Sequence, residues 1–190
     1  MQHSDAPWKA LKRAEEAFGE LKADKSPEDN ADSWQDFLIH IERTWNRAEA
    51  HFAKSPKWNG WKSKYENLRK QDPLLSYVRH ARNADEHSTQ SITKAGPKGI
   101  GINPAVGNRL HLKNMHIGKG KISFETDIPV SIKIIHGEAR AVDVIDRSVQ
   151  YPVPNSHLGK GIDPKLATMA ELVLDFYKDT LTAAEDFFVK

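Results

Sequence analysis

The chain has 190 residues, of which 28% are charged and 38% are hydrophobic, and its formal net charge is +2. This composition is that of a globular protein, and the length suits one buried core, so we expect a single domain over residues 1–190. The chain has no cysteine, which excludes disulfides, thiolate metal ligands and a cysteine nucleophile. Neither a signal peptide nor an apolar run of about 20 residues is visible, which predicts a cytoplasmic protein with no membrane partner.

Helical periodicity dominates the first ninety residues. Hydrophobic side chains recur every three or four residues over residues 7–23, 33–54 and 58–68, and Ser-Pro pairs interrupt the pattern at residues 26–27 and 55–56. Either Asp32 or Ser33 is expected to cap the second helix. Its apolar stripe comprises Trp34, Phe37, Leu38, Ile41, Trp45, Ala48 and Phe52. A stripe of this length indicates a helix with one face buried in a bundle.

A fourth helix is predicted from Pro73 to about residue 88. Asp72 can accept hydrogen bonds from the free N–H groups at a helix start, and proline is tolerated at the first helical position. The same dipeptide, Asp163-Pro164, predicts the start of a last helix with its own apolar stripe. The predicted helical bundle therefore consists of residues 7–90 and 163–188.

The stretch between these two parts has a different composition. Glycine and proline recur after residue 90, and apolar residues alternate with polar ones around Leu110, Ile122, Val130 and Val142. Alternation of this kind, bounded by glycine-rich turns, is typical of short strands. We expect four or five strands in an insert at about residues 98–151. The predicted fold class is α+β: mainly an α-helical bundle, with four N-terminal helices plus a C-terminal helix, and a small antiparallel β-sheet insert.

The fourth predicted helix carries the residues of most chemical interest. Arg79, Asn83 and His87 occupy positions i, i+4 and i+8 on one face, and Arg82 and Glu86 form a neighbouring stripe. An imidazole can deprotonate a ribose 2′-hydroxyl or protonate the leaving 5′-oxygen, and a guanidinium can bind two phosphate oxygens. These groups suit metal-free cleavage of RNA. A two-fold dimer with these helices facing each other would supply two histidines, one as base and one as acid.

The segment Arg82-Asn83-x-x-x-His87 resembles the arginine-to-histidine signature of the HEPN superfamily of helical ribonucleases, including the polar residue directly after the arginine. The resemblance implies a homodimeric bundle and a metal-independent endoribonuclease of a toxin–antitoxin or phage-defence system, with RNA as substrate and a small antitoxin as partner. It implies Arg82 and His87 as the catalytic pair, supported by Asn83, without a cofactor. The β-rich insert departs from the minimal bundle of this superfamily.

Two further residues of the same helix, Arg79 and His80, are candidate substrate-binding groups because they lie beside the motif. A structural interpretation also stays open for this face. Arg82 and Glu86 have the i, i+4 spacing of an ordinary ion pair, and His87 lies near a helix C-terminus, where a cation interacts favourably with the dipole.

The insert begins with a stretch whose charged residues are all basic. No acidic residue occurs between Glu86 and Glu125. Arg109 and Lys113 are candidate substrate-binding residues in this interval, and with His111 they are expected to share one strand face that could bind a phosphate backbone. The alternative is that these are solvated charges that keep a strand edge from aggregating.

Two other functions remain open from the sequence. One is a non-catalytic HEPN-like module that binds RNA or a protein through the basic β insert. The other is an interaction protein whose polar helix face is a dimer interface. A metal site is not expected, because the pairs His80/His87 and His111/His116 lack i, i+4 spacing and a clear carboxylate ligand.

Overall fold

The structure is a computed structural model that describes residues 4–23, 25–118, 120–135 and 137–189. The chain divides into two units. The first joins the residues up to Gly96 with those from Glu138 onward, and the second is Pro97–Gly137. Each unit is described by itself below.

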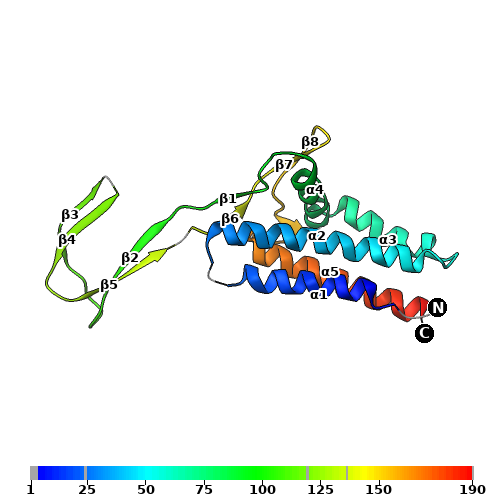
Figure 1. Cartoon of the computed structure of the whole chain (residues 1–190), viewed down its shortest axis with the longest axis horizontal. Helices are drawn as coiled ribbons and strands as arrows, with labels where there is room; N and C mark the ends of the chain where they lie inside the picture. The colour runs from blue at the N-terminus through cyan, green and yellow to red at the C-terminus, as the bar shows by residue number, and fades with distance from the viewer. Residues whose placement is uncertain (1–3, 24, 119, 136, 190) are drawn as a thin grey trace. The chain divides into compact units, whose positions relative to one another are not determined.

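The first unit contains all the helices of the described residues: α1 (Ala6–Leu21), α2 (Pro27–Phe52), α3 (Trp58–Gln71), α4 (Pro73–His87) and α5 (Leu166–Phe188). Figure 1 shows α1, α2 and α5 side by side, with α3 and α4 packed beside them. The seven residues of the predicted stripe on α2 are all buried in this core. The predicted bundle with a C-terminal helix is thereby confirmed. None of the described helices is long and apolar enough to cross a membrane.

Two helix starts differ from the sequence prediction. The second helix begins at Pro27, and the Ser26 hydroxyl accepts a hydrogen bond of 3.1 Å from the Asp29 N–H, so the cap is neither Asp32 nor Ser33. The last helix begins at Leu166 instead of Pro164. The chain stays extended up to Lys165 because that residue forms an antiparallel bridge with Arg140.

The predicted strands form separate antiparallel pairs instead of one sheet. In the first unit, β1 (Thr93–Ala95) pairs with β6 (Ala139–Ala141), β7 (Val144–Asp146) with β8 (Val149–Tyr151), and β9 (Ser156–His157) with β10 (Lys160–Gly161). In the second unit, β2 (Gly99–Pro104) pairs with β5 (Val130–Ile135), and β3 (Leu112–Gly118) with β4 (Lys121–Thr126). The β7–β8 hairpin packs on α4, which decides the geometry of the site described below.

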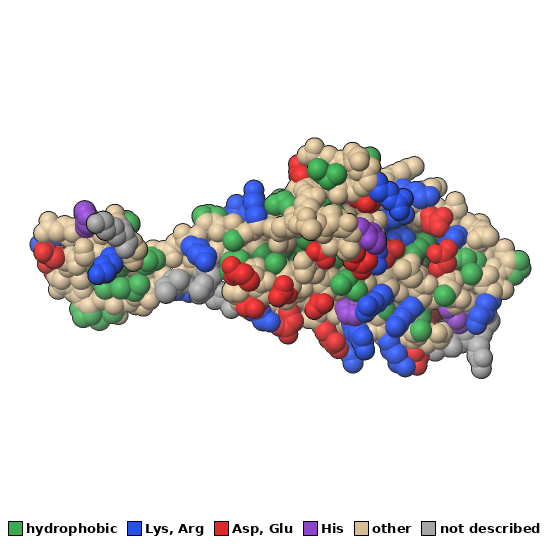
Figure 2. Space-filling model, turned by 45° about the horizontal axis from the view of Figure 1, so that its top comes forward, with side chains coloured by type: hydrophobic (Ala, Val, Ile, Leu, Met, Phe, Trp, Pro, Cys, Tyr) green, Lys and Arg blue, Asp and Glu red, His purple; other side chains and the backbone are tan. Residues whose placement is uncertain are grey.

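The second unit has no buried hydrophobic side chain among its described residues, and several of its apolar side chains are exposed (Figure 2). The larger exposed ones are Ile100, Val106, Met115, Ile117, Ile132 and Ile135. The expected strand face of Arg109, His111 and Lys113 is wrong. Only Lys113 belongs to β3, which begins at Leu112, and the ladder is interrupted by a bulge between Lys113 and His116.

Candidate polar site on helix α4

Helix α4 is fixed at its start and along its inner face. The Asp72 carboxylate accepts a hydrogen bond of 3.0 Å from the Leu75 N–H, which confirms the predicted cap. Leu74, Val78 and Ala81 are buried in the core, as their spacing predicts. The remaining face of the helix therefore presents its polar residues outward and toward the β7–β8 hairpin.

One carboxylate of β7 organises two residues of this face. The Asp146 Oδ2 atom lies 2.7 Å from His80 Nδ1 and accepts a hydrogen bond of 3.0 Å from Asn83 Nδ2. The Asp146 side chain is only 8% exposed, so its carboxylate is hydrogen-bonded to these two side chains of α4 where an exposed carboxylate would be hydrogen-bonded to water. Both contacts fix side chains that the sequence places one turn apart on the same helix.

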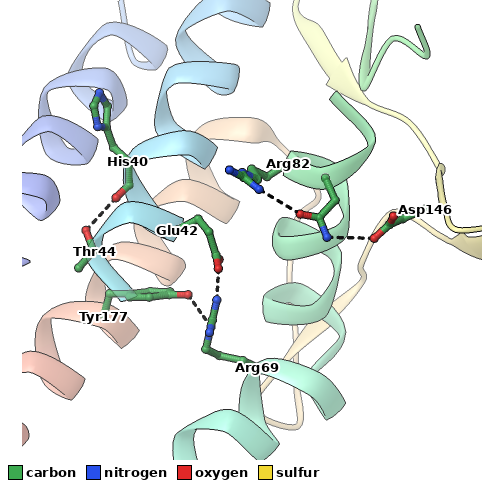
Figure 3. A network of polar contacts seen from close by, with 8 residues as sticks. His40, Glu42, Thr44, Arg69, Arg82, Asp146 and Tyr177 are labelled. Atoms are coloured by element: carbon green, nitrogen blue, oxygen red, sulfur yellow. Dashed lines mark hydrogen bonds and ion pairs between the residues drawn. The ribbon is translucent and has the colours of Figure 1, made fainter. Parts of the chain in front are cut away.

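The arrangement continues from Asn83 to the arginine of the motif. Arg82 Nη1 donates a hydrogen bond of 3.3 Å to Asn83 Oδ1, so the amide connects Arg82 to Asp146 (Figure 3). Arg82 Nη2 forms an ion pair of 2.6 Å with Glu86. The Arg82 Nε atom is buried and has no hydrogen-bond partner among the described residues. Arg82 thus forms the i, i+4 ion pair with Glu86 that the structural interpretation expects, and its Nε–H is a donor without a partner among the described residues.

The surroundings of His80 favour one tautomer. An ionised Asp146 can only accept, so His80 Nδ1 carries the proton of this hydrogen bond and Nε2 is left to exchange protons. Burial is the largest influence on the pKa of Asp146 and raises it, but the hydrogen bonds from His80 and Asn83, with the nearby charges of His80 and Arg147, keep the pKa below its ordinary value. The imidazole also stacks on Tyr151, with 3.6 Å between ring centroids.

The other predicted residues of α4 do not join this arrangement. Arg79 lines a hollow of about 280 Å³ together with Glu42 and Arg69, on the side of α4 that faces α2 and α3. His87 is the last residue of α4, is exposed, and makes no hydrogen bond or ion pair within the part of the chain that the structure describes. The structure therefore joins Arg82, Asn83 and His80, and leaves Arg79 and His87 apart.

The predicted binding residues of the insert belong to the second unit. Arg109 lies in the loop before β3 and is exposed. Lys113 lies on β3 and forms an exposed ion pair of 3.4 Å with Asp127. One of the two cations is thus partly neutralised by a neighbour in its own unit.

The sequence did not reveal Asp146 and Tyr151 as partners of this helix. They are separated from His80 by 66 and 71 residues, and only the alternation around Val142 indicated a strand nearby. Pairing a helix face with a distant hairpin is a tertiary contact that periodicity does not encode.

A second buried polar group lies between α2, α3 and α5, and the sequence did not reveal it either. Arg69 is 6% exposed. Its Nε donates to the Tyr177 hydroxyl at 2.9 Å, and its Nη2 donates to Glu42 Oε2 at 2.5 Å (Figure 3). Its guanidinium also lies over the Trp45 ring, 4.4 Å from the centroid. Burial raises the pKa of Tyr177 to about 12, so the phenol stays protonated and can act as hydrogen-bond partner at neutral pH.

Within the described residues, no group of three or more histidine, aspartate or glutamate side chains is arranged to hold a metal ion. Comparisons of the chain with family models, with curated proteins and with solved structures found no match. The function is therefore argued from the geometry of α4 and its neighbours.

Proposed function

We propose that this protein is a metal-independent endoribonuclease of HEPN type, with His87 as a general acid or base and Arg82 as the phosphate-binding residue. The observation that carries the proposal is the hydrogen-bonded series from Asp146 through Asn83 to Arg82. It holds the motif arginine and its neighbouring amide in fixed positions on a partly exposed helix face. Preorganised donors of this kind are what stabilises charge that develops on a phosphate.

The reaction would use the 2′-hydroxyl of the RNA as nucleophile. One imidazole takes the hydroxyl proton, the 2′-oxygen attacks phosphorus, and the bond to the 5′-oxygen breaks as a second imidazole protonates it. The products are a 2′,3′-cyclic phosphate and a free 5′-hydroxyl. Arg82 would bind the non-bridging phosphate oxygens through its terminal N–H groups, by exchange of its contact with Glu86.

Two imidazoles are needed, and the chain offers them on one stripe. His80 and His87 are seven residues apart on α4, which corresponds to two turns and about 10 Å along the axis. His80 is oriented by Asp146, and His87 is exposed and free to contact substrate. In a two-fold dimer through α4, the His87 of a second copy would take the place of His80.

Cleavage of a mixed RNA pool in excess EDTA tests the proposal. The wild-type protein is expected to cut and leave cyclic phosphate ends. His87→Ala, which removes an acid–base group, and Arg82→Ala, which removes a group that stabilises the charge on phosphate, are each expected to reduce the rate about 100-fold or more. Thr89→Ala, which truncates an exposed side chain just beyond α4, and Lys54→Ala, which removes an exposed cation elsewhere on the first unit, serve as matched controls.

His80→Ala separates the two sources of the second imidazole. Loss of cleavage in this variant, with an unchanged circular dichroism spectrum, assigns the second imidazole to the same helix. Cleavage that survives His80→Ala but not His87→Ala assigns it to a second copy. If neither wild type nor variants cut, or His87→Ala cuts at the wild-type rate, the ribonuclease proposal fails.

The charge of the second unit favours a second candidate, a non-catalytic RNA-binding module. The sequence of this unit has two acidic residues, Glu125 and Asp127. Its described lysine and arginine side chains are more numerous, and all of them are exposed. They are Lys98, Arg109, Lys113, Lys121 and Lys133. This candidate predicts RNA affinity that falls steeply between 50 and 200 mM salt, on the order of 10-fold or more for a few phosphate contacts, and that survives His87→Ala.

A further inference from the structure

A mainly apolar pocket of about 770 Å³ lies in the first unit, away from the polar face of α4. Its walls are α3, α5 and the short β9–β10 hairpin, and its apolar lining includes Tyr65, Leu68, Ile162, Leu172 and Phe176. Pockets of about 300–1,000 Å³ lined in this way are typical of small-molecule sites. The volume therefore suits a molecule with two or three rings.

Two buried polar side chains line this pocket: Thr180, whose hydroxyl donates to the Phe176 carbonyl oxygen, and His157. His157 is 7% exposed, and its Nδ1 lies 2.9 Å from the Asp72 carboxylate. Asp72 also accepts hydrogen bonds from the N–H groups of Leu75 and Leu158, so three donors surround it and it acts as an acceptor. His157 Nδ1 therefore carries a proton, and the other ring nitrogen, Nε2, is an acceptor that makes no hydrogen bond within the described residues.

His157 lines the pocket and its Nε2 has no hydrogen-bond partner among the described residues, so a group inside the pocket can form a hydrogen bond with it. In a pocket of this size that group can belong to a ligand, and in the tautomer that donates to Asp72 through Nδ1 the ligand has to supply an O–H or N–H group to Nε2. The exposed charges at the edge of the pocket are Lys64, Lys160, Asp163, Asp175 and Asp179. Three carboxylates against two ammonium groups do not favour an anion.

We propose that this pocket binds an uncharged, mainly apolar small molecule, of aromatic or alicyclic character, through one hydrogen-bond donor that meets His157 Nε2. The site is independent of the proposed ribonuclease chemistry. It lies close to α4 all the same, because Asp72 both orients His157 and caps that helix.

N-phenyl-1-naphthylamine is a suitable probe, since it is uncharged, aromatic and carries one N–H, and its fluorescence rises in apolar surroundings. We expect one molecule to bind per chain. Ala183→Phe and Thr168→Phe each place a ring into the pocket from α5, and each is expected to lower affinity at least 10-fold. Thr182→Phe adds the same ring on the neighbouring exposed position of α5, outside the pocket, and is expected to leave binding unchanged.

The hydrogen bond to His157 has its own test. 2-Naphthol, which has a donor, should displace the probe about 5-fold better than 2-methoxynaphthalene, which has none, because one net hydrogen bond is worth about that factor. Equal competition by the two compounds would overturn the role of His157. Absence of a fluorescence rise, or binding that persists in both pocket-filling variants when their circular dichroism matches wild type, would overturn the site.

Discussion

At the scale of single residues, Asp146 explains why the outer face of α4 is ordered. It is nearly buried, and both of its partners, His80 and Asn83, belong to that helix. Asp146→Asn keeps the shape of the side chain but removes its charge and one acceptor. We expect a loss of about 1–3 kcal/mol in the free energy of unfolding at pH 7, measured by urea denaturation, because a buried hydrogen-bond donor loses its partner.

The pH dependence of this loss follows from the lowered pKa of Asp146. The folded state binds the proton less readily than the unfolded state, so the carboxylate stabilises the fold above the unfolded pKa of about 3.9. That contribution is lost as the pH falls through the folded pKa. The difference between wild type and Asp146→Asn should therefore shrink below about pH 4. Asp163→Asn, at an exposed position, is the control with no expected effect beyond about 0.5 kcal/mol.

Arg69 is a buried cation whose loss should destabilise the bundle. Arg69→Met keeps much of the side-chain length but leaves Glu42 charged and the Tyr177 hydroxyl without its partner. Removing one member of a buried ion pair costs about 3–5 kcal/mol, and partial exposure of Glu42 places the expected value near the lower end. Chemical denaturation measures the loss. The double variant Arg69→Met with Glu42→Gln should be more stable than Arg69→Met alone, because Glu42 is then no longer an unpaired charge. A free energy of unfolding of Arg69→Met within about 0.5 kcal/mol of wild type would contradict the stabilising role of Arg69.

At the scale of elements, the helices were predictable because their signals are local. The stripe on α2 and the cap at Asp72 each depend on residues within a few positions of one another. The pairing of strands depends on residues far apart, such as Gly99 with Ile135, so alternation predicted strands without predicting that they form separate pairs. The start of α5 was missed for the same reason, because the bridge from Lys165 to Arg140 is a tertiary contact.

The start of α2 gives a prediction that separates two candidate caps. Ser26→Ala removes the acceptor for the Asp29 N–H and should lower the free energy of unfolding by about 1 kcal/mol. Asp32→Ala, at an exposed position within the helix, should change it by less than about 0.5 kcal/mol. The two values, measured by thermal or urea unfolding, would be reversed if the helix began where the sequence pattern indicated.

At the scale of the whole molecule, the candidate site was only half predictable. The motif residues Arg82, Asn83 and His87 are visible in the sequence because they share one helix, and Asn83 does contact Arg82. Asn83, and through it Arg82, is held by Asp146, which the chain reaches only after the whole second unit has been traversed. A sequence pattern that ends with the helix contains no information about that carboxylate.

The same topology makes the second unit removable. The chain leaves and re-enters the first unit at adjacent positions, because Gly96 N–H donates a hydrogen bond of 2.7 Å to Glu138 O. The buried residues of the first unit form a core in which no described residue of Pro97–Gly137 takes part. Replacing that segment by Asn-Gly would close β1 and β6 into a hairpin with a two-residue turn.

We expect the shortened protein to fold, with a melting temperature within about 4 °C of wild type, the shift that about 1 kcal/mol produces in a domain of this size. Gly96 has to be kept in this design, because a Cβ atom there would lie 2.8 Å from Glu138 O. Cleavage of RNA that persists in the shortened protein would locate the active groups in the first unit, and loss of RNA affinity alone would assign binding to the second unit. Failure to fold would show that the second unit stabilises the bundle, contrary to the separation of their cores.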